Sequence, residues 1–273
     1  MDVRNLHGSV SPLSAREPLA EALPGWAGRI VVAEAAAELG ELVAAEVAKA
    51  LRADPDLVLG LATGRTMEPV HAGLVRRLQA LPSGELNTIR DHWRSFNLDE
   101  YVDLAPGDPR SFGATMRRQL GDPLSIPPER LQLPRGLSAD PAAEALRYRE
   151  AIAAAGGIGL QLLGLGHNGH VGFNEPPCLA SAMGRCVELS PSTRLQNGGL
   201  FGGDPAAVPA RAITLGLAEI LQARRILLVV SGSSKAPILS RLLREPANPA
   251  LPASWLQTHP HLQLWVDRAA LDG

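Results

Sequence analysis

The chain has 273 residues, of which 45% are hydrophobic and 20% are charged, and its formal net charge is −2. This length can build one large α/β domain or two small ones around an ample core, and the composition argues against wholesale disorder. The near-zero charge argues against a nucleic-acid binder that works by bulk charge. Two cysteines are too few for a disulfide framework or a cysteine-based zinc site.

Residues 1–27 are mixed and polar and contain three prolines. They predict a leader that is poorly ordered or packed on the surface, and they lack the basic start and apolar run of a secretory signal. No apolar run approaches the roughly 20 residues of a membrane-spanning helix. We therefore expect no membrane segment, and the small number of cysteines fits a location in the reducing cytoplasm.

Strand-like and helix-like segments alternate from residue 28 onward. Apolar runs predict strands over residues 29–33, 56–61, 93–98, 158–165, 211–215, 226–230 and 262–266. Helical spacing of apolar residues predicts helices over residues 34–51, 67–81, 111–120, 142–155, 217–221 and 235–244.

Apolar strands that alternate with helices favour a parallel sheet covered on both faces. We therefore predict an α/β fold, with a single Rossmann-like domain over residues 28–273 and a mostly parallel sheet. The stretch of residues 176–209 is rich in Gly, Ser and Pro and predicts a lid-like segment.

Ligands of such sheets bind outside the carboxyl ends of the strands, so the loops that follow strands carry the functional signal. The first such loop holds Thr63, Gly64, Arg65 and Thr66 before a predicted helix. Backbone amides at a helix N-terminus attract anions, the hydroxyls add donors, and a guanidinium suits phosphate. An ordinary capped turn between strand and helix explains the same residues, and the loop is not a Walker A motif.

The second loop pairs two carboxylates, Asp99 and Glu100. A desolvated carboxylate can act as a general acid or base, and only one of two neighbours on a strand faces a ligand. A solvated acidic loop is the alternative interpretation.

The third loop, Gly164–Pro177, is dense in glycine and holds His167, Asn168, His170 and Glu175. A histidine beside a carboxylate can exchange protons near neutral pH. A metal site formed by His167, His170 and Glu175 competes with this interpretation, but the spacing lacks the support of a helical metal motif.

The fourth loop ends at Lys235, where a predicted helix begins. Only Lys49 and Lys235 are lysines among 26 basic residues, so the chain ordinarily uses arginine. A cation at a helix N-terminus is opposed by the helix dipole, and a bound anion would explain its position. Compositional drift is the alternative explanation for the scarcity of lysine.

Together these segments resemble the glucosamine-6-phosphate deaminase/isomerase family, within a superfamily that also contains 6-phosphogluconolactonases. The resemblance covers roughly residues 30–267 and rests on the segments Ala62–Thr66, Leu98–Val102, Asp108–Phe112, Gly164–Pro176 and Gly232–Lys235.

The resemblance implies conversion of glucosamine 6-phosphate to fructose 6-phosphate and ammonia, without metal or organic cofactor. It assigns proton transfer between C2 and C1 to Asp99, ring opening to His170, and support of that histidine to Glu175 and Asn168. The phosphate is assigned to the Thr63–Thr66 loop and to Lys235. On this basis we class the chain as a hydrolase of amino-sugar metabolism whose partner is a small sugar phosphate, acting as a monomer or homo-oligomer.

The chain departs from the family pattern at three places. Asn168 stands where many members have aspartate, and Gly199 stands where the family has a phosphate-binding arginine, a loss for which Arg65 is the candidate replacement. Arg185 matches one member of an allosteric basic pair, but Val187 occupies the other position. Galactosamine 6-phosphate as substrate, a 6-phosphogluconolactonase and a sugar-phosphate sensor without turnover are the alternatives.

Overall fold

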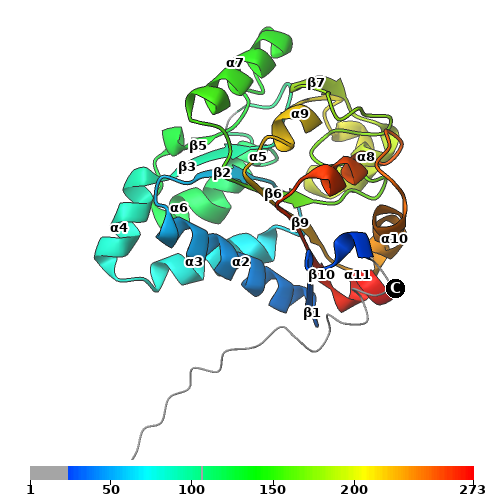
Figure 1. Ribbon diagram of the computed structural model, residues 1–273. Coiled ribbons are helices and arrows are strands. Elements are labelled where there is room, and N and C mark those ends of the chain that lie inside the picture. Colours follow the sequence, from blue (N-terminus) through cyan, green and yellow to red (C-terminus); the bar gives the residue numbers. More distant parts are fainter. Residues whose placement is uncertain (1–23, 106) are drawn as a thin grey trace, which may run out of the picture.

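A central sheet of seven strands organises the chain, whose computed structural model describes residues 24–105 and 107–273 (Figure 1). The strand order is β1-β10-β9-β6-β2-β3-β5, and every pairing is parallel. The strands are β1 (Ile30–Ala33), β2 (Val58–Leu61), β3 (Arg94–Asn97), β5 (Leu131–Gln132), β6 (Leu160–Gly164), β9 (Arg225–Val230) and β10 (Leu262–Asp267). The predicted α/β fold with a mostly parallel sheet is confirmed.

Helices cover this sheet, and α2 and α3 pack side by side along it (Figure 1). The buried side of α2 carries Leu39, Val43, Val47 and Leu51 at helical spacing, which explains why this segment forms a helix and which face it buries. The α-helices are α2 (Ala36–Ala53), α3 (Glu68–Gln79), α4 (Ser83–His92), α5 (Phe112–Met116), α6 (Asp122–Leu124), α7 (Pro141–Ala154), α8 (Pro191–Asn197), α9 (Leu217–Ile220), α10 (Ala236–Arg244) and α11 (Arg268–Asp272).

Short turns of tighter or wider helix connect these elements. They are η1 (Pro24–Trp26), the π-helical η2 (Arg117–Gly121), η3 (Pro128–Arg130), η4 (Gly198–Phe201), η5 (Pro205–Ala207), η6 (Ser233–Lys235) and η7 (Pro252–Thr258). The predicted helix over residues 111–120 is thus an α-helix that continues into a π-helical turn.

A second, antiparallel sheet of three strands lies beside the first. It has the order β4-β8-β7, with β4 (Asp99–Tyr101), β7 (Arg185–Glu188) and β8 (Arg211–Thr214). The strand predicted over residues 211–215 therefore belongs to this small sheet. Its pairing partners β4 and β7 are short, and no apolar run in the sequence predicts them.

Leu98 joins the two sheets. Its amide donates to Leu61 O at the end of β2, and its carbonyl accepts from Leu215 N just after β8, both at 2.8 Å. The chain therefore changes sheets between Asn97 and Asp99, and this places β4 at the carboxyl edge of the parallel sheet.

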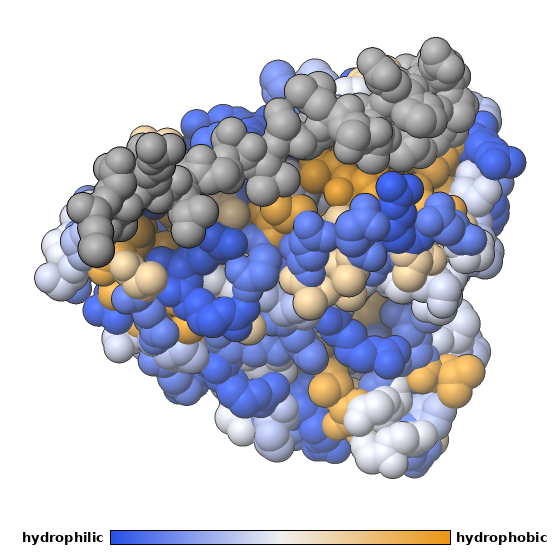
Figure 2. All heavy atoms as spheres, turned by 90° about the horizontal axis from the view of Figure 1, so that it is seen from below, coloured by the Kyte–Doolittle hydropathy of each residue, from blue (hydrophilic) through white to orange (hydrophobic). Residues whose placement is uncertain are grey.

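The predicted leader extends to residue 27, but residues 1–23 lie outside the described part of the chain. Within 24–27, Trp26 is buried against the main core. Figure 2 shows a face on which hydrophilic side chains surround separate hydrophobic areas. In the described ranges, no helix combines the length and the apolar character that crossing a membrane requires.

Candidate active site

The sheet order brings three of the four predicted loops together. Strands β9, β6 and β2 are neighbours, so the loops that follow Val230, Gly164 and Leu61 leave the same edge side by side. Asp99 reaches this edge through Leu98, which is bonded to the end of β2. Asp99 lies close to the third loop, because a Cβ added at Gly172 of that loop would be 3.5 Å from Asp99 Oδ2. The residues that the sequence singled out therefore converge on one region.

The Asp99 carboxyl is buried, with 6% of the residue exposed. Burial raises the pKa of Asp99 to about 8, and the neighbouring charge of Glu100 adds to this rise. No hydrogen bond from a described group counteracts it. A carboxylate in this state accepts a proton readily near neutral pH, as a general base requires.

Glu100, the next residue on β4, has a different task. Its carboxyl accepts hydrogen bonds from the backbone amides of Tyr101, Phe112 and Gly113 at 2.8, 3.0 and 2.8 Å. It thereby holds the first turn of α5 against β4. The alternation of the strand explains this division of roles, because the two carboxyls project to opposite faces.

His170 lies on the third loop and is oriented by Asn168. The Nδ1 and Asn168 Oδ1 atoms are 2.6 Å apart, and the backbone amide of His170 also donates to Oδ1 at 3.2 Å. The imidazole packs directly over Gly166, where an added Cβ would lie 2.3 Å from the ring. Burial lowers the pKa of His170 to about 4; the Glu175 charge opposes this effect, and Lys235 and His167 reinforce it.

Glu175 is bound to the start of α8. Its carboxylate accepts from Ser190 N at 3.0 Å, from Ser190 Oγ at 2.7 Å and from Thr193 Oγ1. Burial raises the pKa of Glu175, but these hydrogen bonds outweigh burial and the net shift is downward. Glu175 therefore acts on His170 through its charge, and it links the loop that carries His170 to the segment predicted as a lid.

The cations form one cluster at this edge. Burial lowers the pKa of Lys235 to about 8, and the charge of Arg65 lowers it further. His167 has a lowered pKa from burial and from the charges of Lys235 and Arg65. From the sequence, His167 was expected only as a metal ligand, and its position beside the two cations was not predicted. A bound dianion would relieve the mutual repulsion of these groups.

Two further polar residues support the loops and were not predicted. Asp267, at the end of β10, accepts from Ser231 Oγ at 2.5 Å and from Gly232 N at 3.0 Å. It thus fixes the turn before Lys235. Asn174 donates to Leu215 O at 2.8 Å and accepts from Arg185 Nη1 at 3.0 Å. The sequence offers only weak signals for them: Asp267 is a polar residue at the end of an apolar strand, and Asn174 lies in the glycine-rich loop Gly164–Pro177.

The structure also gives the positions of the other residues that the sequence singled out. Thr63 and Thr66 are half-buried on either side of Gly64, whose φ of +105° suits glycine, and Arg65 is exposed. Gly199 lies in η4, and a Cβ there would meet nothing within 4 Å. Across 24–105 and 107–273, no cluster of three His, Cys, Asp or Glu side chains is arranged to hold a metal ion.

The fold and this edge define an α/β protein with an acid–base pair beside a cationic cluster. The chain belongs to the glucosamine-6-phosphate isomerases/6-phosphogluconolactonase family, whose model matches residues 32–265. Glucosamine-6-phosphate deaminases from Geobacillus sp. and Rhodopirellula baltica are 42% and 43% identical to it. The alignments cover 86% and 84% of this chain and 91% and 88% of those proteins.

Solved structures agree with this assignment. A monomeric glucosamine-6-phosphate deaminase superposes with a TM-score of 0.84 and 34% identity, over 89% of this chain and 99% of its own. A 6-phosphogluconolactonase from Trypanosoma cruzi superposes with a TM-score of 0.71 over 90% of this chain and 96% of its own, but at 18% identity it shares the fold alone. The prediction that the chain is a hydrolase is wrong, because these relatives are named deaminases.

Proposed function

We propose that this chain converts glucosamine 6-phosphate to fructose 6-phosphate and ammonia. The observation that carries the proposal is Asp99, a buried carboxyl without a hydrogen-bond partner among the described residues, at the same sheet edge as an oriented histidine and a cationic cluster. The relatives at 37–43% identity that are named glucosamine-6-phosphate deaminases support it.

Phosphate binding is assigned to Lys235, Arg65 and the loop with Thr63, Gly64 and Thr66. These groups lie at the end of β2 and the end of β9, on either side of the loop that carries His170. A phosphate held there leaves the sugar carbons to extend toward His170 and Asp99. The remote anion thus orients the reacting end of the substrate.

Ring opening is assigned to His170. Because Asn168 Oδ1 is only an acceptor, it fixes the proton on Nδ1 and leaves Nε2 to exchange a proton with the ring oxygen and the C1 hydroxyl. Asn168 thus performs the orienting part of the task that an aspartate has in many relatives. Glu175 contributes its negative charge.

Isomerisation and deamination follow in the open chain. Asp99 removes the proton from C2 and returns it to C1, while a second proton passes from the C2 amino group to O1, so the C1 aldehyde becomes an alcohol and an imine remains at C2. Water adds to C2, the C–N bond breaks and ammonia leaves, so the keto group of fructose 6-phosphate remains. One buried carboxylate can serve two adjacent carbons because they lie only one bond apart.

The partner is a sugar phosphate, and we place the reaction in the cytoplasm, where the free thiols of Cys178 and Cys186 would persist. A monomer is one possible state, as in the structural relative that is described as monomeric. We propose the segment 176–209 as a lid because Glu175 joins it to the catalytic loop.

A coupled assay tests the proposal with the purified full chain. It follows ammonia and fructose 6-phosphate from glucosamine 6-phosphate, with galactosamine 6-phosphate and 6-phosphogluconolactone as parallel substrates. Release of both products at equal rates from the glucosamine substrate supports the proposal. Turnover of the lactone alone identifies a lactonase, and binding of sugar phosphates without any turnover identifies a sensor.

A further inference from the structure

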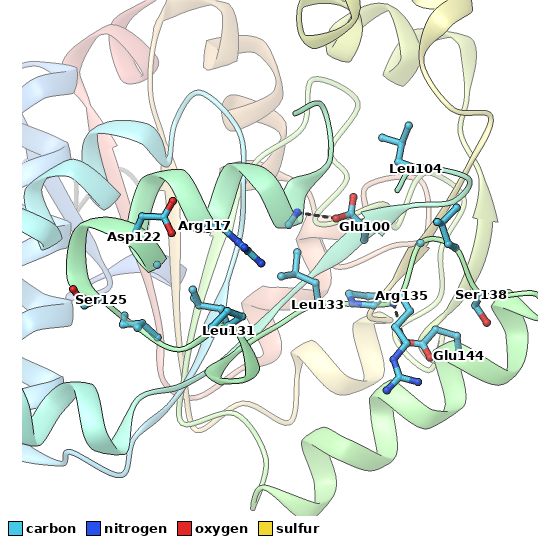
Figure 3. Close-up of a pocket in the computed structure, with 17 residues that line it drawn as sticks. Glu100, Leu104, Arg117, Asp122, Ser125, Leu131, Leu133, Arg135, Ser138 and Glu144 are labelled. Carbon is cyan, nitrogen blue, oxygen red and sulfur yellow. Dashed lines mark hydrogen bonds between the residues drawn. The ribbon is translucent and has the colours of Figure 1, made fainter. Parts of the chain in front are cut away.

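A cavity of about 850 Å³ lies outside the catalytic edge and is lined by Glu100 (Figure 3). Asp99 and Glu100 are consecutive on β4, so this cavity and the catalytic edge lie on opposite sides of that strand. Its walls come from α5, η2, the segment 125–138 and the start of α7. None of the residues assigned above to the phosphate or to His170 lines it.

One part of the wall of this cavity is apolar. Leu104, Ile126, Leu131 and Leu133 line it, and Leu137, with 58% of its surface exposed, adds an apolar contact at the rim. These side chains offer no hydrogen bonds to a polyhydroxyl compound such as a sugar. A ligand that fills this space therefore needs an apolar body.

Two arginines, Arg117 and Arg135, line this cavity, and both are exposed. Figure 3 shows Arg117 extending from the helix toward Leu131 and Leu133, with Arg135 on the loop after β5, beside Glu144. The ion pairs described nearby join Arg110 to Asp108 and Arg147 to Glu144, so they involve neither Arg117 nor Arg135.

The carboxylates of the cavity are mostly satisfied within the chain. Glu100 accepts three backbone amides, and Glu144 accepts two bonds from Arg147 and one from the Arg135 amide. Asp122 is exposed and lies on the side of Arg117 that faces away from Arg135 (Figure 3). The charged groups still available to a ligand are therefore the guanidinium groups of Arg117 and Arg135, the second of which also acts on Glu144 through its charge.

The local backbone also fits a binding site. Arg117 begins the π-helical turn that ends at Gly121, and π-helical turns occur often at functional sites. A Cβ at Gly121 would lie 2.7 Å from Leu131 Cδ1, so glycine lets the leucine wall approach the helix.

We propose that this cavity is a second binding site, for a small organic anion with an apolar body, held by Arg117 and Arg135 against the leucine wall. A carboxylate, sulfonate or phosphate supplies the anionic group. The site differs from the proposed catalytic centre in both chemistry and place, and its occupancy does not depend on the proposed function.

Fluorescence titration of the full chain with 8-anilinonaphthalene-1-sulfonate tests this site, because the probe joins a sulfonate to an apolar body. N-phenyl-1-naphthylamine has the same body without the sulfonate. The variants are Arg117→Gln, Arg135→Gln and the double variant. Arg118→Gln is the matched control, since Arg118 is exposed one residue further along and contacts Thr115 at 3.4 Å.

We expect each arginine substitution to weaken binding of the sulfonate probe roughly tenfold, and the double substitution roughly a hundredfold, as loss of charge-assisted contacts requires. Arg118→Gln and the uncharged probe should show no such dependence. Equal binding of the sulfonate by the unmodified chain and both variants would overturn the proposal, as would equal affinity for the two probes. Thermal unfolding of each variant verifies that the fold is intact.

Discussion

The Nδ1 atom of His170 lies 2.6 Å from Oδ1 of Asn168, two residues before it. An amide oxygen orients the imidazole and fixes its tautomer as a carboxylate would, but it adds no negative charge. This separates two functions that an aspartate combines: orientation is kept and charge is absent. The low pKa of His170, about 4, is consistent with that absence.

Asn168→Asp should therefore raise the pKa of His170 by about one unit or more, because a nearby carboxylate favours the charged imidazolium. NMR titration of the ring measures the pKa, and the acid limb of the kcat/KM profile should move upward with it. Asn87→Asp adds the same charge at an exposed position on α4, and it should change neither the pKa of His170 nor the acid limb of the profile. An unaltered His170 titration in Asn168→Asp would contradict this account of the low pKa.

Gly166→Ala should displace the imidazole, since the added methyl would lie 2.3 Å from its Cε1 and Nε2 atoms. Misplacement of a catalytic group by about 1 Å costs on the order of 100-fold in rate, so we expect kcat/KM to fall by at least that factor. Gly84→Ala, where a Cβ meets nothing within 4 Å, is the control and should keep full activity. Similar kinetics of the two variants would remove His170 from the reaction.

Asp99→Asn should lower kcat by roughly 10² to 10⁴, the usual contribution of a general base, while sugar-phosphate binding persists. Ammonia release measures the loss of kcat, and titration calorimetry measures the binding of sugar phosphate. Glu100→Gln should instead lower stability by about 1–3 kcal/mol, because its amide cannot accept from all three backbone donors. Retained turnover in Asp99→Asn would exclude Asp99 as the base.

The difference in stability between Asp99→Asn and the unmodified chain should depend on pH. The folded-state pKa of Asp99, about 8, exceeds its ordinary value of 3.8, so the folded chain binds the proton more tightly than the unfolded chain. Stability from this group is complete below the lower value and is lost as pH rises toward 8. The variant should therefore unfold at a higher temperature than the unmodified chain at pH 8 and at nearly the same temperature near pH 4. Calorimetric scans at both pH values check this sign.

Arg65→Ala should raise KM roughly tenfold and leave kcat nearly unchanged, because a phosphate contact contributes equally to ground and transition states. Steady-state kinetics with glucosamine 6-phosphate measures both constants. Arg244→Ala removes an exposed arginine at the far end of α10 and should alter neither. An unchanged KM in Arg65→Ala would show that Arg65 does not compensate for the arginine missing at Gly199.

Much of the fold was predictable because its strands are apolar and its helices have a clear period. The runs at Ile226–Val230 and Leu160–Gly164 became neighbouring central strands, and the loops after them became the cationic edge. The small sheet could not be foreseen, since β4 and β7 gain their partners only through contacts with the distant β8.

The candidate site was predictable as a set of loops, but its internal bonds were not. That Glu175 would bind Ser190 and Thr193, and that Arg185 would bind Asn174, depends on how the chain folds back over itself. The side chains of Asp99 and Glu100 were expected to face different ways, and the separate environments of the two carboxyls agree with that expectation.

Strand β4 is three residues long and forms a wall common to the catalytic edge and the cavity behind it. Thermodynamic linkage makes any influence across such a wall reciprocal: an anion that changes the affinity for sugar phosphate by some factor has its own affinity changed by the same factor. The affinity for one ligand, measured with and without the other, therefore gives the coupling free energy between the two sites, whichever ligand is titrated. A compound that binds the cavity more tightly when sugar phosphate is present must therefore raise the affinity for sugar phosphate by the same factor.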